Sequence, residues 1–312
     1  PVPIIIGTHF CQGAVMSPKI AFVIPCYNEA VTIADVVAQA KAALPAADVY
    51  VYDNNSTDGS ADIAREAGAI VRHVRKQGKG SVVRRMFADI DADIYVMTDG
   101  DLTYDVKETP RLIDLLIDGR NDMVVGTRVE TVKEAYPLFH RFGNAFLTGL
   151  VRMLFGIKQT DMLSGFRVFS KRFAKTFPAR SNGFEIETEL NVFTAMNDLP
   201  FAEAPTDYFA RPAGSFRKLS TFKDGFKIAV MIARLITAER PALLFGVLSF
   251  LNLCALGIGF WFHPDAFITE CWLFCGFWFF LFCTVLCGVS TRFRREAVRL
   301  SYLSYPFIGK AE

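Results

Sequence analysis

The chain carries little net charge and lacks the cysteine pattern of a disulfide-stabilised protein. Its 34 Lys and Arg residues nearly balance its 32 Asp and Glu residues, which leaves a net charge of +2. Such a small excess gives no strongly basic footprint, so we expect no nucleic-acid partner. Five of the seven cysteines lie inside very apolar segments, namely Cys254, Cys271, Cys275, Cys283 and Cys287.

The spacing of these cysteines leaves two interpretations open. Cys271 and Cys275 are four residues apart, as are Cys283 and Cys287, and residues at this spacing share one face of a helix. Such pairs could hold a metal ion, but no histidine or carboxylate lies within the same segments. We therefore favour the alternative, in which they are small, soft apolar residues on helix faces.

The beginning of the chain lacks the basic residues with which a secretory signal peptide opens. The apolar run Ile4-Ile5-Ile6 is too short for a signal peptide or a membrane anchor. Met16 has the character of a natural start. We expect residues 1–18 to be a poorly ordered N-terminal extension.

What the chain has in excess is apolar sequence. Hydrophobic residues make up 52% of it, the mean hydropathy is +0.27, and most of the surplus lies beyond Pro241. Before that point, predicted strands at 20–24, 49–52, 70–74, 93–98 and 122–126 alternate with predicted helices at 29–44, 60–67, 80–90 and 106–117. Asp58 is expected to cap the second helix. Strands that are apolar on both faces and separated by helices predict an α/β fold, with a mostly parallel sheet covered by helices on both faces.

Polar residues follow the predicted strands where each strand ends. The clusters are Tyr27-Asn28-Glu29, Asp53-Asn54-Asn55-Ser56, Arg75-Lys76 and Asp99-Gly100-Asp101. In doubly wound sheets, ligands bind beyond the carboxyl ends of the strands. Four polar loops that converge on one edge therefore predict an active-site crevice there.

The triplet Asp99-Gly100-Asp101 is the most informative of these clusters. In extended chain the two carboxylates project to the same side, and the glycine between them allows a tight turn. Two close carboxylates repel each other unless a cation lies between them. Hard oxygen ligands favour Mg²⁺ or Mn²⁺, the usual partners of a diphosphate. A solvated turn is the alternative for an isolated triplet, and the neighbouring loops favour the metal site.

Two segments after residue 126 combine helical apolar spacing with basic residues, at 138–155 and 216–236. Each could lie at a membrane interface or pack on the sheet, and for the second we favour the interface. Two nearly unbroken apolar runs follow at 242–262 and 271–290. About 20 residues cross a hydrocarbon core, so both could span a membrane. A pair of helices buried in a soluble protein is the alternative.

The distribution of basic residues predicts the orientation of such a hairpin. The connection 263–270 has no Lys or Arg, whereas both flanks are basic, with Arg234, Arg240, Arg292, Arg294, Arg295 and Arg299. By the positive-inside rule both flanks are cytoplasmic. We therefore expect a multi-pass protein of the cytoplasmic (inner) membrane. Its parts are a cytoplasmic catalytic domain (19–215), an interfacial helix region (216–240), a transmembrane hairpin (241–291) and a cytoplasmic tail (292–312).

Six motifs, in this order along residues 19–219, resemble those of the inverting family-2 glycosyltransferases with a GT-A fold. They are similar above all to the polyprenyl-phosphate glycosyltransferases, which include dolichyl-phosphate mannose synthases and bactoprenol glucosyltransferases. The motifs run from Ile24 to Glu29, from Asp53 to Gly59, from Gly78 to Gly80, from Asp99 to Asp101, from Ser164 to Arg167 and from Arg211 to Lys218. The set is specific, although no single piece is.

The resemblance implies roles at the nucleotide end of a donor site. Pro25, Tyr27 and Glu29 would shape this end of the pocket, and Asp53 would hydrogen-bond the base or ribose. The family usually has a second Asp after this one, where this chain has Asn54, whose amide can still donate and accept hydrogen bonds. An ordinary polar turn is the alternative for this stretch.

The resemblance also implies which residues surround the diphosphate and the sugar. Lys79 would add charge at a helix start whose N–H groups attract phosphate, although a glycine-rich turn is the alternative. Asp161 and the loop from Ser164 to Arg167 would close the sugar site. Arg211, Ser215 and Lys218 resemble a mobile loop over the diphosphate, with Arg217 where the family has Ser.

For the metal, the resemblance implies Mg²⁺ or Mn²⁺ on Asp99 and Asp101, bridging the donor's diphosphate. The family's dolichyl-phosphate mannose synthases have Gln where this chain has Thr103, a weaker ligand. Arg128 and Arg141 match positions that bind the acceptor phosphate, and Arg suits bidentate phosphate contacts. A lipid-headgroup contact is the alternative for Arg141.

Three glutamates, Glu185, Glu187 and Glu189, could include a catalytic base. A phosphate monoester has a second pKa of about 6 and is already an anionic nucleophile near neutral pH. We therefore interpret these glutamates as structural, or as partners of basic residues.

The resulting hypothesis is an inverting, metal-dependent transfer of one sugar from a nucleotide sugar to a polyprenyl phosphate at the cytoplasmic face. We favour a UDP-sugar, with GDP-mannose as the other donor. A membrane glycosyltransferase with another lipid or polysaccharide acceptor, or a non-catalytic nucleotide-sugar-binding subunit, are the alternatives. Homo-oligomers are compatible with the apolar helices.

Overall fold

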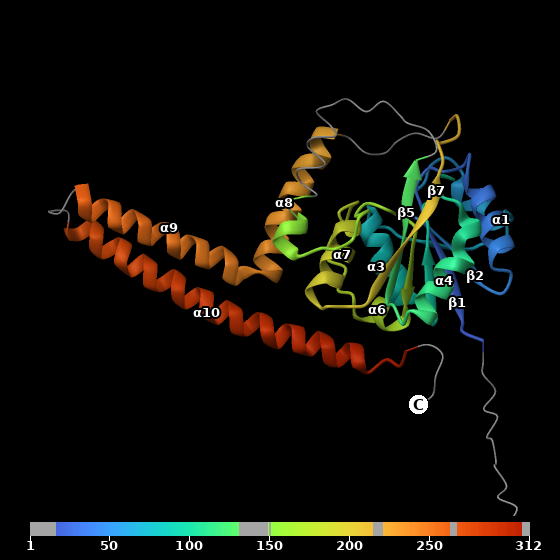
Figure 1. Ribbon diagram of the computed structural model, residues 1–312. Helices are drawn as coiled ribbons and strands as arrows, with labels where there is room; N and C mark the ends of the chain where they lie inside the picture. Colours follow the sequence, from blue (N-terminus) through green and yellow to red (C-terminus); the bar gives the residue numbers. More distant parts are fainter. Residues whose placement is uncertain (1–16, 131–148, 150, 215–220, 263–266, 308–312) are drawn as a thin grey trace, which may run out of the picture.

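The computed structural model describes residues 17–130, 149, 151–214, 221–262 and 267–307. They form an α/β domain from which two long helices extend side by side (Figure 1). The strands are β1 (Ile20–Cys26), β2 (Asp48–Asp53), β3 (Ile70–His73), β4 (Ile94–Met97), β5 (Met123–Glu130), β6 (Arg167–Ser170) and β7 (Phe201–Tyr208). The helices are α1 (Ile33–Ala43), α2 (Ser60–Glu66), α3 (Lys79–Asp89), the 3-10 helix η1 (Val106–Glu108), α4 (Thr109–Asp118), α6 (Lys171–Thr176), α7 (Ile186–Met196), α8 (Thr221–Glu239), α9 (Pro241–Phe262) and α10 (Phe267–Leu303).

The strands form one seven-stranded sheet in the order β3-β2-β1-β4-β6-β5-β7. Only β6 runs antiparallel to its neighbours β4 and β5, and the other pairs are parallel. The sheet confirms the predicted mostly parallel α/β fold. The carboxyl ends of β1, β2, β4 and β5 therefore lie at one edge of the sheet. The polar residues that follow these strands are expected to lie at the same edge.

Helices cover both faces of the sheet because successive residues of each strand point to opposite sides. In β1, Ala21 and Val23 belong to a core shared with α3, α6 and α7, whereas Phe22 and Ile24 belong to one shared with α1, α2 and α4. These four residues are fully buried. A strand buried on both faces needs the continuous apolar run that the sequence shows.

One local expectation was wrong. Asp58 does not cap α2, because Gly59 is the N-cap residue and has a φ of 86°. The Asp58 carboxylate instead accepts hydrogen bonds from the backbone N–H groups of Ala30 (3.0 Å) and Ser60 (3.0 Å). It therefore ties the loop after β1 to the start of α2.

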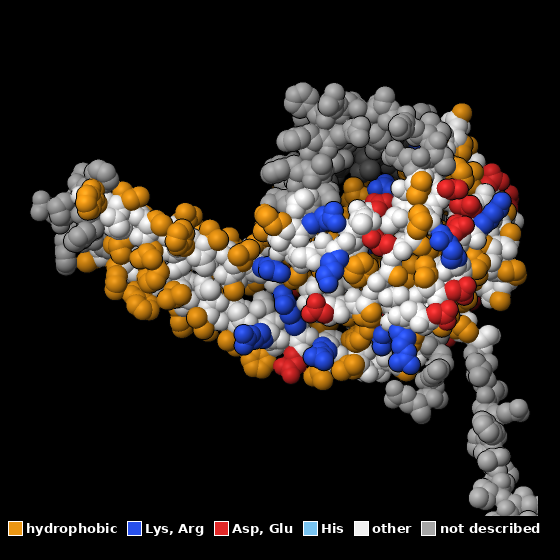
Figure 2. All heavy atoms as spheres, viewed as in Figure 1, with side chains coloured by type: hydrophobic (Ala, Val, Ile, Leu, Met, Phe, Trp, Pro, Cys, Tyr) orange, Lys and Arg blue, Asp and Glu red, His pale blue; other side chains and the backbone are white. Residues whose placement is uncertain are grey.

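The predicted apolar hairpin is present as α9 and α10. Both helices are long and apolar enough to cross a membrane, and few of their residues are buried within the protein. Helix α9 has 22 residues, so it is about 33 Å long, close to the thickness of a hydrocarbon core. Figure 2 shows hydrophobic side chains along the outside of this hairpin.

Helix α8 joins the hairpin to the α/β domain. Its residues Met231, Ile232 and Leu235 are buried in a third apolar cluster, together with Val192 and Met196 of α7. This face of α8 packs on the domain, so a membrane interface remains a prediction for the rest of the helix. Of the predicted helix at 138–155, residues 151–155 are helical, and most of the remainder lies outside the described residues.

Candidate active site

Asp99 and Asp101 directly follow β4, in the loop at the carboxyl edge of the sheet. Asp101 is 3% exposed, and its Oδ1 accepts a hydrogen bond of 2.6 Å from the Thr103 hydroxyl. Burial, followed by the charge of Asp99, raises the pKa of Asp101 above its ordinary value. Thr103 therefore holds one oxygen of Asp101 in place, and the neighbouring charge of Asp99 disfavours ionisation of Asp101.

Each of these carboxylates lies against a cation. Lys79 Nζ is 2.5 Å from Asp99 Oδ1 and 2.6 Å from Glu187 Oε1, and Arg211 Nη2 is 2.5 Å from Asp101 Oδ2. Burial would lower the pKa of Lys79, but its two carboxylate partners outweigh burial and raise it. Lys79, the first residue of α3, is thus held in its charged form between Asp99 in the loop after β4 and Glu187 on α7.

The Lys79 contacts clarify the role of the glutamates. Burial raises the pKa of Glu187, whereas its ion pair with Lys79 opposes that shift. Glu189 accepts hydrogen bonds from the backbone N–H groups of Arg180 and Ser181, both at 2.8 Å. Both side chains are therefore partners of neighbouring groups, in keeping with the interpretation made from the sequence.

The loop before β6 approaches Asp99 closely. A Cβ on Gly165 would lie 2.3 Å from Asp99 Oδ2, so a larger residue at this position would displace the Asp99 carboxylate. The Gly165 N–H donates to the Tyr104 hydroxyl at 2.7 Å. Fully buried Arg167 donates to the carbonyls of Ser164 (2.8 Å) and Met162 (3.0 Å), and so holds this loop against the acidic pair.

Arg128, on β5, forms a two-pronged ion pair with Asp161. Its Nε and Nη2 each donate to a carboxylate oxygen at 2.8 Å, and its backbone N–H adds a third contact at 3.0 Å. Burial opposes ionisation, but these contacts hold the pKa of Asp161 below its ordinary value. The guanidinium also lies 5.5 Å from the centre of the Tyr208 ring. Arg128, predicted to bind the acceptor phosphate, and Asp161, predicted to close the sugar site, are therefore direct partners.

At the end of β2, Asp53 and Asn54 have different surroundings. Asp53 Oδ2 lies 3.0 Å from His73 Nδ1. The Asn54 amide donates to the carbonyls of Val74 (2.8 Å) and Lys76 (2.9 Å), and its oxygen accepts from the Gly78 N–H (2.6 Å). Asn54 thus shapes the loop that leads into α3, which a carboxylate could not do because it lacks N–H donors.

Other predicted donor residues line the same edge. Pro25 is the penultimate residue of β1, Tyr27 is 40% exposed just beyond that strand, and Glu29 is buried with its N–H bonded to Ser60 Oγ. Arg141, Ser215 and Lys218 lie outside the described residues.

Two aromatic residues of the site had no assigned role from the sequence. The Tyr104 and Tyr208 rings are 5.2 Å apart, between Gly165 on one side and Arg128 on the other. Tyr104 lies shortly after Asp99-Gly100-Asp101 in the sequence, and this proximity could have indicated that it belongs to the site. Tyr208 is the last residue of β7, a strand that was not predicted from the sequence. No sequence pattern therefore indicated a role for Tyr208 in the site.

A mostly parallel seven-stranded sheet with an acidic pair after a central strand is typical of the GT-A fold. The profile of the family described as Glycosyl transferase family 2 matches residues 21–177. The chain belongs to this family and is a glycosyltransferase, as its motifs predicted.

Relatives agree with this assignment, and a solved structure is similar in fold. The chain is 35% identical to glycosyltransferase AglJ of Haloferax volcanii over 75% of its own length and 77% of that protein. It is 30% identical to the dolichyl-phosphate hexose transferase of the same organism, over 71% of the chain and 95% of that protein. Glucosyl-3-phosphoglycerate synthase from Mycobacterium tuberculosis, solved with Mn²⁺, uridine diphosphate and glucosyl-3-phosphoglycerate, is similar in fold. Its TM-score is 0.57 at 22% identity, covering 72% of this chain and 80% of that one.

Proposed function

We propose that this glycosyltransferase transfers one sugar from a nucleotide sugar to a polyprenyl phosphate at the membrane surface. The proposal rests on one observation. The same chain contains the acidic edge at Asp99 and Asp101 and an apolar helical hairpin. A water-soluble donor and a lipid acceptor would meet where these two parts meet. The name of the dolichyl-phosphate hexose transferase relative supports this acceptor class.

The acidic edge fits a divalent cation. Asp99 and Asp101 offer hard oxygen ligands, and the cations paired with them are consistent with a site that attracts positive charge. No group of three or more His, Cys, Asp or Glu side chains that could hold a metal occurs among the described residues. Substrate oxygens would therefore complete the coordination. When bound, Mg²⁺ or Mn²⁺ would supply charge that stabilises the leaving diphosphate, and a solved structure of similar fold contains Mn²⁺.

The nucleotide would lie over the ends of β1 and β2. Asp53, held beside His73, can accept a hydrogen bond from the base or ribose. Lys79 would act through Asp99, since its ammonium group is already bound between two carboxylates. We favour a UDP-sugar, and uridine diphosphate in the similar fold supports this choice.

The acceptor phosphate would bind at Arg128. Two of its donor groups hold Asp161. Among the described residues no partner contacts Nη1, which could therefore donate to a phosphate oxygen, since Arg has five N–H donors. The side chain of Arg128 is 30% exposed. Arg141 remains a second predicted contact.

The chemistry needs no protein base. The phosphate monoester is largely dianionic at neutral pH, because its second pKa is about 6. Its oxygen would attack the anomeric carbon in line, the bond to the nucleoside diphosphate would break, and the configuration would invert. Glu187, bound to Lys79, is consistent with a structural role.

The first experiment combines purified protein with undecaprenyl phosphate, Mn²⁺ or Mg²⁺, and a panel of UDP- and GDP-sugars. Nucleoside diphosphate release that requires both the lipid phosphate and the metal is the expected result and would identify the donor. Release without lipid would indicate a different acceptor or hydrolysis. No release with any donor would favour a non-catalytic subunit.

A further inference from the structure

The last turns of α10 return to the α/β domain at the edge opposite the candidate active site. Asp122, immediately before β5, is fully buried there. It accepts hydrogen bonds from Ser170 Oγ (2.6 Å), from Arg172 Nε (2.6 Å) and Nη2 (3.0 Å), and from the hydroxyl of Tyr302 on α10. The buried Asp122 carboxylate thus connects strand β6, helix α6 and the C-terminal end of helix α10.

Aromatic packing reinforces this contact. The Arg172 guanidinium lies 4.5 Å from the centre of the Tyr302 ring and 4.7 Å from that of Phe307. Val298 and Tyr302 also pack against the apolar core on this face of the sheet. We call the group of Asp122, Arg172, Tyr302 and Phe307 the tail clamp.

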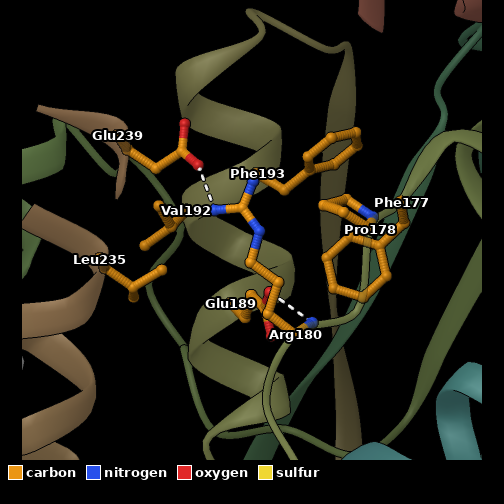
Figure 3. Close-up of a pocket in the computed structure, with 8 residues that line it drawn as sticks. All are labelled: Phe177, Pro178, Arg180, Glu189, Val192, Phe193, Leu235 and Glu239. Carbon is orange, nitrogen blue, oxygen red and sulfur yellow. Dashed lines mark hydrogen bonds and ion pairs between the residues drawn. The ribbon is translucent and has the colours of Figure 1, made fainter. Parts of the chain in front are cut away.

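The hairpin has a second attachment at the end of α8. Arg294 and Arg295 of α10 donate to the carbonyls of Ala238 and Glu239, the second at 3.3 Å. The Glu239 carboxylate in turn pairs with Arg180 at 3.0 Å (Figure 3). Cationic side chains at a helix C-terminus are favourable because the last carbonyls lack helical partners.

The two attachments hold the domain at different points. The junction at Glu239 lies beside α7, whereas the tail clamp lies at the amino end of β5 (Figure 1). Arg128 stands at the other end of the same strand, six residues from Asp122 and about 20 Å away at the usual rise of a strand. A domain attached to the hairpin at one point could rotate about that point, whereas a second attachment fixes the tilt of the domain relative to the hairpin.

We propose that the tail clamp is a positioning device that sets the tilt of the catalytic domain relative to the membrane, so that the site meets a membrane-embedded acceptor. Tyr302 and Arg172 are then positioning residues that touch no substrate. The inference rests on the proposed polyprenyl-phosphate acceptor. It predicts that the clamp matters for an acceptor fixed in the membrane and not for one that diffuses freely.

The test compares Tyr302→Ala with wild type on two acceptors, a polyprenyl phosphate in phospholipid vesicles and a short-chain, water-soluble prenyl phosphate. We expect kcat/KM for the vesicle acceptor to fall about tenfold or more while that for the soluble acceptor stays within about twofold, because small misplacements of reacting groups are costly. Leu303→Ala is the matched control, since Leu303 is the next residue of α10 and is 63% exposed. It should behave as wild type.

Tyr302→Phe separates the hydroxyl from the ring and should give a smaller, equally acceptor-selective loss. Limited trypsin digestion provides a readout without turnover, because release of the clamp should speed cleavage after Arg299. Equal losses on both acceptors, or no loss on either, would overturn the positioning role. Wild-type protein inactive towards both acceptors with every donor would instead overturn the proposed function.

Discussion

Charged side chains alternate in sign along the acidic edge. Lys79 lies between Asp99 and Glu187, Arg211 pairs with Asp101, and Arg128 pairs with Asp161. Alternation is expected, because a buried charge without a partner is very unfavourable. Since these cations are already held by carboxylates, we infer that a bound diphosphate needs the additional charge of a metal ion.

Asp101→Ala should lower turnover about a hundredfold or more, because loss of a metal that stabilises the leaving group costs several kcal/mol of transition-state stabilisation. Diphosphate release at saturating Mn²⁺ measures this effect. Membrane extraction should resemble wild type, and thermal melting measures separately the stability lost with the Arg211 and Thr103 contacts. Turnover close to normal in this variant would contradict the metal assignment.

Asn54→Asp should destabilise the protein. The change removes two N–H donors and places a carboxylate against the carbonyls of Val74 and Lys76. We expect a loss of about 1–3 kcal/mol of unfolding free energy and a raised KM for the donor. Chemical denaturation and donor titration measure both. An unchanged midpoint and KM would show that the loop tolerates the charge.

Asp161→Asn should reveal a pH-dependent contribution of the Arg128 ion pair. The pKa of Asp161 is lowered in the folded state, so this stabilisation is present above its unfolded value of about 3.9 and is lost as the pH falls through the lower folded value. The variant should be about 1–3 kcal/mol less stable at pH 7. This difference should shrink below about pH 4, as followed by thermal melting. A difference that is constant with pH would rule out the ion pair as its source.

At the scale of elements, small and polar residues set how closely α9 and α10 pack. Ser249 Oγ donates to the Phe277 carbonyl at 3.4 Å. A Cβ on Gly276 would lie 3.0 Å from Asn252 Nδ2, so the glycine allows the close approach of the two helices. Small residues commonly allow such contacts between membrane helices.

Gly276→Leu should therefore separate the two helices and destabilise the hairpin by about 1–3 kcal/mol, the usual effect of overpacking. Thermal melting in detergent measures this loss. Gly288→Leu is the matched control, because no atom lies within 4 Å of a Cβ at Gly288. Equal effects of the two changes would indicate general helix perturbation instead of loss of the contact at Asn252.

At the scale of the whole molecule, charge on either side of the hairpin predicts its orientation. Lys and Arg side chains gather where the hairpin meets the catalytic domain (Figure 2), and the connection 263–270 has none. An alkaline phosphatase reporter inserted after Pro264 should be active, because this enzyme requires an extracytoplasmic location. A fluorescent protein fused after Glu312 should be fluorescent in the cytoplasm. The reverse pattern would contradict the positive-inside prediction.

Strands β1 to β5 were predictable from their own residues. Runs such as 20–24 and 93–98 are apolar on both faces, and each ends in polar residues that meet at one edge. β6 and β7 were not predicted. β6 has only four residues and begins with Arg167, and β7 contains Glu203, Pro205 and Asp207, so neither shows a continuous apolar run. Their places depend on pairing with β4 and β5.

The class of enzyme, the acidic pair and the two apolar helices could all be predicted from the sequence, because each depends on short motifs or apolar runs. The pairing of distant side chains, in contrast, depends on the folded arrangement of the chain. Lys79 meets Glu187 across 108 positions, and Asp122 meets Tyr302 across 180. Such pairs form because strands and helices pack against one another in the folded protein. No local pattern of charge or hydropathy predicts which residues far apart in the sequence will meet.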